Sequence, residues 1–407
     1  MDAKQFIFAG WLLDGSGGPV REKVLLQVKN GTIAGMESCS RENISDLSNV
    51  TDLSHCTILP PLIDSHVHLF MSGTIDPKVR KDQLIAGYDD LKSVIERHLN
   101  YFLSHGVLAI RDGGDRGGHV LRYRDELDGK SPVRIKASGR AWRQKGRYGR
   151  LIGRSPKEGE SLASSFLADD DEADWVKLVN SGLNSLKVYA KETDSQFSDD
   201  EISALVRAAE QRGKKVMVHA NGHLPVKQAL EAGCHSIEHG FFMGRDNMQL
   251  MAEKEVVWVP TVYTMKAYAE NVDSQQSDGD QRVILRTLEH QLEQLAVARE
   301  LGVNLALGTD AGSLGVLHGE SMVEEMKLYK KAGYTLPEVV RCATYNGAKL
   351  LDLDKNMGLL QAGRPATFLV ARGTPAQLPR KLSYLEDIYQ DGKSYGMYRK
   401  NPVKNVV

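Results

Sequence analysis

Short β-prone segments alternate with helix-prone segments between residues 57 and 356, and this alternation restricts the fold more than any other feature of the chain. Eight strands that each lead into a helix predict an α/β protein, specifically a closed (β/α)8 barrel of the TIM barrel class. An open doubly wound sheet is the alternative, but no Gly-x-Gly-x-x-Gly motif follows the first candidate strand. The candidate strands are residues 58–62, 107–111, 133–137, 185–189, 215–219, 235–239, 256–261 and 304–307.

Helix start signals occur between these candidate strands. Ser198 and Glu201 have the spacing of a capping box, which predicts a helix over residues 202–211. Thr335 opens another helix, which has a proline in its first turn. Residues 172–181 also have the period of an amphipathic helix, so we expect a helix there as well.

The two ends of the chain differ in character from its middle. Residues 1–56 contain short strand-like runs, and the pair Asn30 and Gly31 between two of them predicts a tight hairpin. Residues 357–407 return to strands and turns. We therefore expect residues 1–56 and 357–407 to form one composite β-sandwich domain, and residues 57–356 to form the barrel.

Charge and cysteine content limit the partners of the chain. A net charge of −1 over 407 residues gives no general attraction to nucleic acid or to an anionic membrane. No apolar run has the length of a membrane span, no export signal begins the sequence, and the four cysteines form no Cys-x-x-Cys motif. We expect a cytoplasmic protein with reduced cysteines, a small-molecule substrate, no nucleic-acid or membrane partner, and assembly into a homo-oligomer.

Residues that bind metals follow several of the candidate strands. His66 and His68 lie one residue apart after the first strand, and alternate residues of a strand point to the same side, so both imidazoles can reach one ion. His219, His239 and Asp310 also close β-prone segments. In a barrel these strand ends meet at one face, which is where such enzymes keep their active sites. Nitrogen and carboxylate donors in this mixture suit zinc, with manganese or cobalt as substitutes.

Five motifs in this order resemble those of the amidohydrolase superfamily, a group of metal-dependent barrel hydrolases, and within it the imidazolonepropionase-like and prolidase-like members. The motifs are Leu-Pro-Pro-Leu-Ile-Asp-Ser-His-Val-His (59–68), Gly-Leu-Asn-Ser-Leu-Lys (182–187), Val-Met-Val-His-Ala (216–220), Gly-Cys-His-Ser-Ile-Glu-His-Gly (233–240) and Leu-Gly-Thr-Asp-Ala-Gly (307–312). The resemblance extends over nearly the whole chain.

The resemblance implies a two-metal site in which Asp310 also moves the catalytic proton. His66, His68 and Asp310 would hold one zinc ion, and His219 and His239 would hold the second. Lys187 would bridge the two ions as a carbamate derived from carbon dioxide. A buried lysine loses its proton readily, and its neutral amine can then add carbon dioxide.

Lys177 is the alternative bridging residue. We prefer Lys187 because residues 172–181 resemble a helix that ends at Gly182. Lys187 then follows Gly182 at the spacing of the family's Gly-x-x-x-Ile-Lys pattern.

The loop after the third candidate strand is strongly basic. Between Arg134 and Lys157 there are nine basic residues and no acidic one. Such a loop over the barrel mouth would attract an anionic substrate, and we expect Arg140, Arg143 and Arg147 to bind its carboxylate. A solvated loop or a subunit contact is the alternative.

Two other positions near the mouth concern the substrate. His223 is a further candidate for substrate binding, or else it only begins the next helix. Asn221 departs from the resemblance, because prolidase-like relatives often carry an aromatic residue or histidine there. The usual grip on an α-carboxylate is therefore in doubt.

These features predict a metal-dependent hydrolase that cleaves a C–N amide bond through a metal-bridging hydroxide. The substrate would be an N-acyl amino acid, a dipeptide or a ring amide that carries a carboxylate. One alternative is a deaminase or a cyclic-amidine (imidazolone) hydrolase with a single metal ion, which needs no bridging lysine. A catalytically silent barrel that serves as a scaffold is the alternative outside enzymes.

Overall fold

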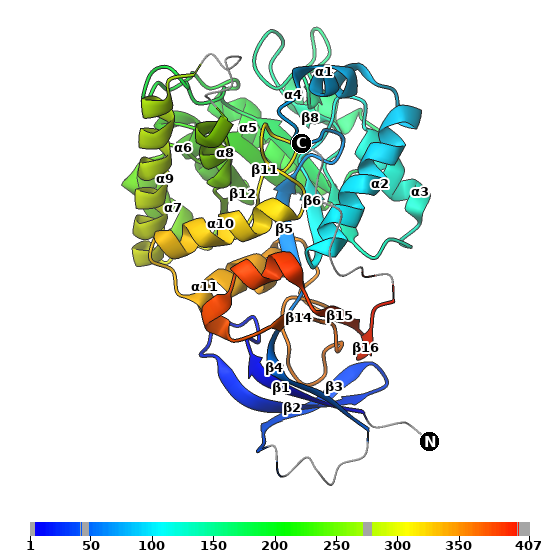
Figure 1. Cartoon of the computed structure of the whole chain (residues 1–407). Coiled ribbons are helices and arrows are strands. Elements are labelled where there is room, and N and C mark those ends of the chain that lie inside the picture. Colours follow the sequence, from blue (N-terminus) through cyan, green and yellow to red (C-terminus); the bar gives the residue numbers. More distant parts are fainter. Residues whose placement is uncertain (1–4, 41, 43–48, 272–278, 397, 399–407) are drawn as a thin grey trace.

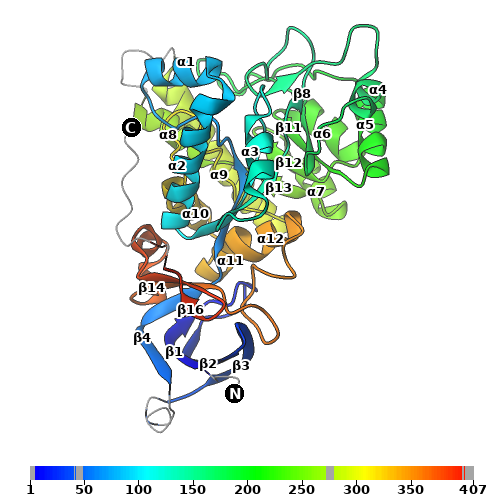
Figure 2. The ribbon, with the colours of Figure 1, turned by 90° about the vertical axis from the view of Figure 1, so that its right-hand side faces the viewer.

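The two ends of the chain form one sheet that lies below a larger α/β unit in the computed structural model (Figures 1 and 2). The structure describes residues 5–40, 42, 49–271, 279–396 and 398. The order in the sheet is β16-β15-β14-β4-β1-β2-β3. Its strands are β1 (Gln5–Leu12), β2 (Arg21–Lys29), β3 (Thr32–Ser38), β4 (Val50–Leu59), β14 (Phe368–Arg372), β15 (Asp387–Gln390) and β16 (Lys393–Ser394).

The pairing of the chain ends is direct, as the strand-like character of both ends predicts. β14 pairs antiparallel with the second half of β4, with Leu369 opposite Leu59. The hairpin at Asn30 is confirmed, because β2 and β3 pair antiparallel around it. Leu369 packs into the core of the α/β unit, while its neighbours Phe368 and Val370 belong to a separate core of the sheet.

The α/β unit contains two parallel sheets with helices outside them in both views (Figures 1 and 2). Its strands are β5 (Leu62–Val67), β6 (Val107–Asp112), β7 (Arg134–Ala137), β8 (Ala141–Trp142), β9 (Gly153–Arg154), β10 (Trp175–Val179), β11 (Lys215–Ala220), β12 (Ser236–His239) and β13 (Val257–Val259). One sheet has the order β5-β6-β7, and the other has the order β13-β12-β11-β10-β8-β9.

Two helices begin at the start signals expected from the sequence. The capping box of Ser198 and Glu201 is formed at the start of α5, and Thr335 caps α11 in the same way. The helices are α1 (Pro77–Ile85), α2 (Tyr88–Ser104), α3 (His119–Leu127), α4 (Leu162–Leu167), α5 (Asp199–Gln211), α6 (His223–Glu231), α7 (Arg245–Glu253), α8 (Tyr263–Asn271), α9 (Gln281–Leu301), α10 (Glu320–Lys331), α11 (Leu336–Arg341) and α12 (Gly347–Leu350). None of the helices that the structure describes is both long and apolar enough to cross a membrane.

The fourth strand differs from the sequence prediction. Residues 185–189 form no strand, and residues 172–181 form no helix; the strand is β10, Trp175–Val179. Its five residues are all buried, which is typical of a central parallel strand covered on both faces. Such a short apolar run has no period that separates a strand from a helix, and this ambiguity explains the error.

Hydrogen bonds connect the two parallel sheets on both sides. On one side, the amide of Asp174, just before β10, donates to the carbonyl of Ala137 at the end of β7 (2.8 Å). On the other side, residues 304–307 lie between β13 and β5. The amide of Ala306 donates to Trp258 in β13 (3.0 Å), and the amide of Ser65 in β5 donates to the carbonyl of Leu307 (2.9 Å).

Candidate metal centre

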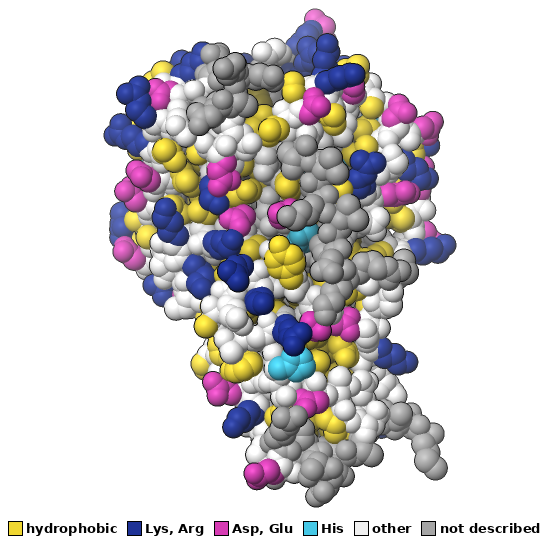
Figure 3. Space-filling model, viewed as in Figure 1, with side chains coloured by type: hydrophobic (Ala, Val, Ile, Leu, Met, Phe, Trp, Pro, Cys, Tyr) yellow, Lys and Arg dark blue, Asp and Glu magenta, His cyan; other side chains and the backbone are white. Residues whose placement is uncertain are grey.

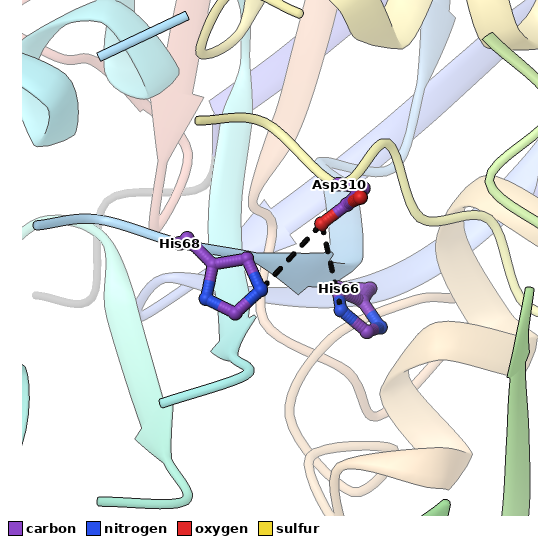
Figure 4. Close-up of side chains that lie close together, drawn as sticks. All are labelled: His66, His68 and Asp310. Atoms are coloured by element: carbon purple, nitrogen blue, oxygen red, sulfur yellow. Dashed lines mark ion pairs between the residues drawn. The ribbon is translucent and has the colours of Figure 1, made fainter. Parts of the chain in front are cut away.

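Two histidines at the end of β5, His66 and His68, converge with Asp310 from the loop after residues 304–307, as Figure 4 shows. Asp310 Oδ1 lies 3.7 Å from His66 Nε2 and 3.5 Å from His68 Nε2. Both imidazoles are almost fully buried, and one atom of each of the three residues lies within 4.8 Å of the others. The sequence prediction that these three residues come together is therefore confirmed.

A second pair of histidines lies against the first. His219, in β11, and His239, at the end of β12, have ring centroids 4.6 Å apart. The ring of His239 is in turn 5.0 Å from the ring of His66. The ends of three strands thus bring four imidazoles to the same cavity, and the loop after residues 304–307 adds the carboxylate of Asp310.

Each imidazole uses one ring nitrogen for a bond to the protein, which fixes the orientation of the ring. This arrangement is typical of metal-binding histidines, because it leaves the other nitrogen as a ligand. The pairs are His66 Nδ1 with Glu238 Oε2 (2.5 Å), His68 Nδ1 with the Gly114 carbonyl (2.9 Å), His219 Nε2 with the Gly182 carbonyl (3.2 Å), and His239 Nδ1 with Thr261 Oγ1 (2.7 Å).

Glu238 fixes the ring of His66 through its bond to Nδ1. Glu238 was not identified as part of the site from the sequence. Its other carboxylate oxygen accepts from Arg111 Nη2 (2.8 Å), and both side chains are completely buried. Arg111 also donates through Nε to the carbonyl of Ser65 (2.7 Å). A buried charge needs such a partner. The available signal was therefore the presence of an arginine and an acid within two short strand-like segments, Val107–Asp112 and Ser236–His239.

Lys177, not Lys187, lies in the cavity with the histidines. Lys177 is 1 % exposed, and its Nζ has no hydrogen-bond partner among the described residues. Lys187 is exposed and lies in the loop after β10. The expected position of Lys187 in strand four is wrong, because that strand ends at Val179.

Burial keeps the histidine side chains neutral, which is the state in which an imidazole binds a metal ion. It lowers the pKa of His68 to about 4 and that of His219 to about 3, so both are neutral at pH 7. Burial also lowers the pKa of Lys177 to about 8, which makes its neutral amine accessible. The pKa of Asp310 is raised to about 6 by burial, against the opposing hydrogen bond from Ser313.

The backbone around the cavity is held in an uncommon conformation. Asp310 has φ = 60°, His239 has φ = 67°, and Thr261 has φ = 45°. Positive φ is least favourable for a β-branched residue such as Thr261. Non-glycine residues of this kind concentrate at functional sites, where the surrounding structure stabilises them.

The cavity has a volume of about 370 Å³, and its wall beyond the histidines is largely apolar. Arg80, Tyr148 and Asn221 also line it, and the sequence had not pointed to Arg80. The amide of Phe241 donates to the side chain of Asn221 (3.1 Å). Apolar side chains in the wall include Met71, Leu151, Ile152, Phe241, Met265 and Leu314.

Of the four side chains predicted to bind the substrate, the structure brings only Arg147 to the cavity among the residues it describes. Arg140 is bound instead to Asp171 (2.9 Å), because the acidic segment before β10 neutralises part of the basic loop. Arg143 donates to the carbonyl of Gln144 in its own loop.

His223 also lies outside the cavity lining. It begins α6 and pairs with Asp246 (2.6 Å).

On the face seen in Figure 3, acidic and basic side chains are intermixed.

The donor set fits a metal site. His66 Nε2 and Lys177 Nζ are buried polar atoms without hydrogen-bond partners among the described residues. Such atoms are costly unless a ligand or ion satisfies them. Gly113 adds a second sign, because a Cβ there would lie 2.9 Å from His68 Cε1 and 3.1 Å from His66 Nε2. The space beside the two rings is thus kept open.

Comparisons with known proteins find a family and several similar proteins. The Amidohydrolase family matches residues 57–405. Ochratoxinase from Aspergillus niger is 24% identical over 370 residues, which cover 84% of this chain and 75% of that protein. Imidazolonepropionase from Agrobacterium fabrum is 24% identical over 398 residues, covering 88% and 86%. A crystal structure of a Xaa-Pro dipeptidase with bound methionine in the active site superposes with a TM-score of 0.81 and 26% identity, covering 97% of this chain and all of that one.

Replacing Gly113 by alanine tests whether the space between the rings is used. We expect Gly113→Ala to weaken zinc binding by about 10-fold or more while the protein stays folded, since the new methyl group displaces His66 and His68. Gly35→Ala is the matched control, because a Cβ at Gly35 meets nothing within 4 Å. Zinc titration of both variants, with circular dichroism, is the measurement; unchanged zinc affinity in Gly113→Ala would contradict the assignment.

Proposed function

The chain belongs to the amidohydrolase family of C–N bond hydrolases, and we propose that it is a metal-dependent enzyme that cleaves an amide bond in a small, carboxylate-bearing substrate. The observation that carries the proposal is the meeting of four histidines, Asp310 and the buried Lys177 in one cavity. A catalytically silent scaffold would have no need to bury these groups together.

We further propose that the two parallel sheets and residues 304–307 form one closed (β/α)8 barrel. The hydrogen bonds from β7 to β10 and from β13 through residues 304–307 to β5 support this closure. The likeness to the dipeptidase structure supports it as well. The sheet of the chain ends would then be the composite β-sandwich domain, and the candidate metal centre would lie at the C-terminal face of the barrel.

His66, His68 and Asp310 would hold one zinc ion, and His219 and His239 would hold another. Lys177 would bridge them after modification: its neutral Nζ forms an N–C bond to carbon dioxide and releases one proton, and the resulting carbamate presents two oxygens. This assignment moves the bridge from Lys187 to Lys177, in β10, whose Nζ lies in the cavity. A single-metal deaminase or imidazolone hydrolase requires no bridging lysine. The presence of Lys177 in the cavity therefore favours the two-metal hydrolase.

The bound metals would supply Lewis acidity and would lower the pKa of a water molecule. Asp310 would accept the proton of the attacking water and would return it to the leaving nitrogen. Ser313 holds the carboxylate in place by donating to Oδ2 (2.8 Å).

The substrate would be an N-acyl amino acid, a dipeptide or a ring amide. The cavity volume of about 370 Å³ suits a molecule of this size, and its apolar wall suits an apolar acyl group or side chain. The structurally similar Xaa-Pro dipeptidase supports the dipeptide class.

Amide hydrolysis by zinc-loaded protein tests the function directly. We expect the enzyme to hydrolyse at least one member of a panel of N-acyl amino acids, dipeptides and ring amides, and a chelator to abolish this activity reversibly. Asp310→Asn should lower kcat by about 10²- to 10⁴-fold, because the proton transfer is lost. Asp246→Asn, which alters a carboxylate outside the cavity, is the control and should retain activity. Ammonia release without amide hydrolysis would contradict the proposal and favour the deaminase.

Zinc content distinguishes the two lysines. After loading with zinc and bicarbonate, we expect about two ions per chain in the wild type and in Lys187→Ala, but fewer in Lys177→Ala, because only Lys177 lies in the cavity. The loss should not depend on unfolding, which thermal denaturation of each variant checks. Equal zinc content in all three proteins would exclude a bridging lysine.

A further inference from the structure

Arg80 is a partly buried cation in the wall of the metal cavity. It lies in α1, the helix that follows β5, and lines the cavity together with Asp310. Among the residues that the structure describes, no carboxylate lies within ion-pair distance of its guanidinium, although the Asp310 carboxylate attracts it across the cavity wall. The guanidinium is therefore not occupied by a direct salt bridge, and an anionic ligand in the cavity can bind to it.

The bonds of Arg80 leave part of its guanidinium available. Its Nη1 donates to the carbonyls of Ser72 (2.9 Å), Thr74 (3.4 Å) and Gly312 (3.1 Å). No bond from Nε or Nη2 is formed to the described part of the chain. One edge of the guanidinium is therefore fixed to the protein, and the fork of Nε and Nη2 remains for an anion.

The position of Arg80 relative to Asp310 fits an α-carboxylate. Arg80 is tied to Gly312, two residues after Asp310, which would protonate the leaving nitrogen. In an amino acid, the carboxylate is attached to the carbon next to that nitrogen. An anion held at Arg80 thus belongs to the amino acid that leaves, rather than to the acyl group.

The other arginines of the cavity are less suited to this task. Arg147 and Arg150 also line the cavity, but both are exposed, and Arg147 donates to the carbonyl of Asp194 (2.9 Å). Contacts made by exposed cations are weakened by water, whereas a partly buried arginine binds an anion more strongly.

We propose that Arg80 binds the α-carboxylate of the leaving amino acid and so selects substrates with a free carboxylate there. This inference rests on the proposed amide hydrolysis. The side chain of that amino acid would lie near Met71, Tyr268 and Leu314, which line the cavity with Arg80. An amino acid with a large apolar side chain therefore fits this end of the cavity best.

A matched pair of substrates tests the role of Arg80. N-acetyl-L-leucine and N-acetyl-L-leucinamide differ only in the carboxylate, and hydrolysis of either releases acetate, which is measured. We expect Arg80→Met to lower kcat/KM for the acid by about 10²-fold, mainly through KM, and for the amide by less than about threefold. Arg80→Lys should be intermediate, because it keeps the charge and loses the fork.

A structural role of Arg80 would give a different result. Asp76 caps the start of α1 by accepting from the amide of Lys78 (2.8 Å), so Asp76→Ala loosens the same helix without removing a side chain that holds the guanidinium. We expect Asp76→Ala to change the acid and the amide by the same factor. If Arg80→Met also lowers both substrates equally, or lowers neither, the proposed carboxylate contact is wrong.

Binding separates this inference from the proposed hydrolysis. If zinc-loaded wild type hydrolyses no member of the panel, the proposed function fails, and calorimetric titration with N-acetyl-L-leucine still tests Arg80. Tighter binding of the acid than of the amide, lost in Arg80→Met, would support the inference. Equal binding of the acid to the wild type and to Arg80→Met would overturn it.

Discussion

The buried ion pair between Glu238 and Arg111 is the interaction on which the site depends. Both side chains are fully buried, and the pair joins β12 to β6, while Glu238 also holds the ring of His66 in β5 (2.5 Å). Neither charge is tolerable there without the other. Because the pair fixes both a strand contact and the orientation of a proposed ligand, the geometry of the centre is part of the core rather than a feature of mobile loops. The remaining imidazoles are held by backbone carbonyls or by Thr261 in the same manner.

The parts of this architecture that sequence predicts are those with a local signal. The alternation of side chains along a strand predicts that His66 and His68 point to the same side. The capping box at Ser198 predicts the start of α5. The fourth strand lacks such a signal, because its apolar run also fits a helix, and the choice of Lys187 followed from that ambiguity. The prediction that Arg140 and Arg143 of the basic loop bind the substrate was wrong for another reason. Arg140 is neutralised by Asp171, which lies 31 residues away, and no local pattern reveals such a pairing.

The cavity joins two kinds of chemistry. The polar floor of the cavity consists of neutral imidazoles, a carboxyl group with a pKa of about 6 and a lysine with a lowered pKa. Apolar side chains form much of the remaining wall, with Arg80 beside Asp310 as the partly buried cation. A substrate with an amide bond at the floor, a carboxylate at Arg80 and apolar groups against the wall satisfies all three regions. The family supplies the reaction class, while Arg80, under the proposal made above, would belong to the part of the site that determines the substrate.

The most direct test of this account is anomalous diffraction at the zinc edge from crystals of protein loaded with zinc and bicarbonate. The account predicts two zinc peaks, one among His66, His68 and Asp310 and one between His219 and His239. It also predicts electron density for a carbamate on Nζ of Lys177 that reaches both peaks. A single peak beside an unmodified Lys177, or zinc bound elsewhere, would contradict it.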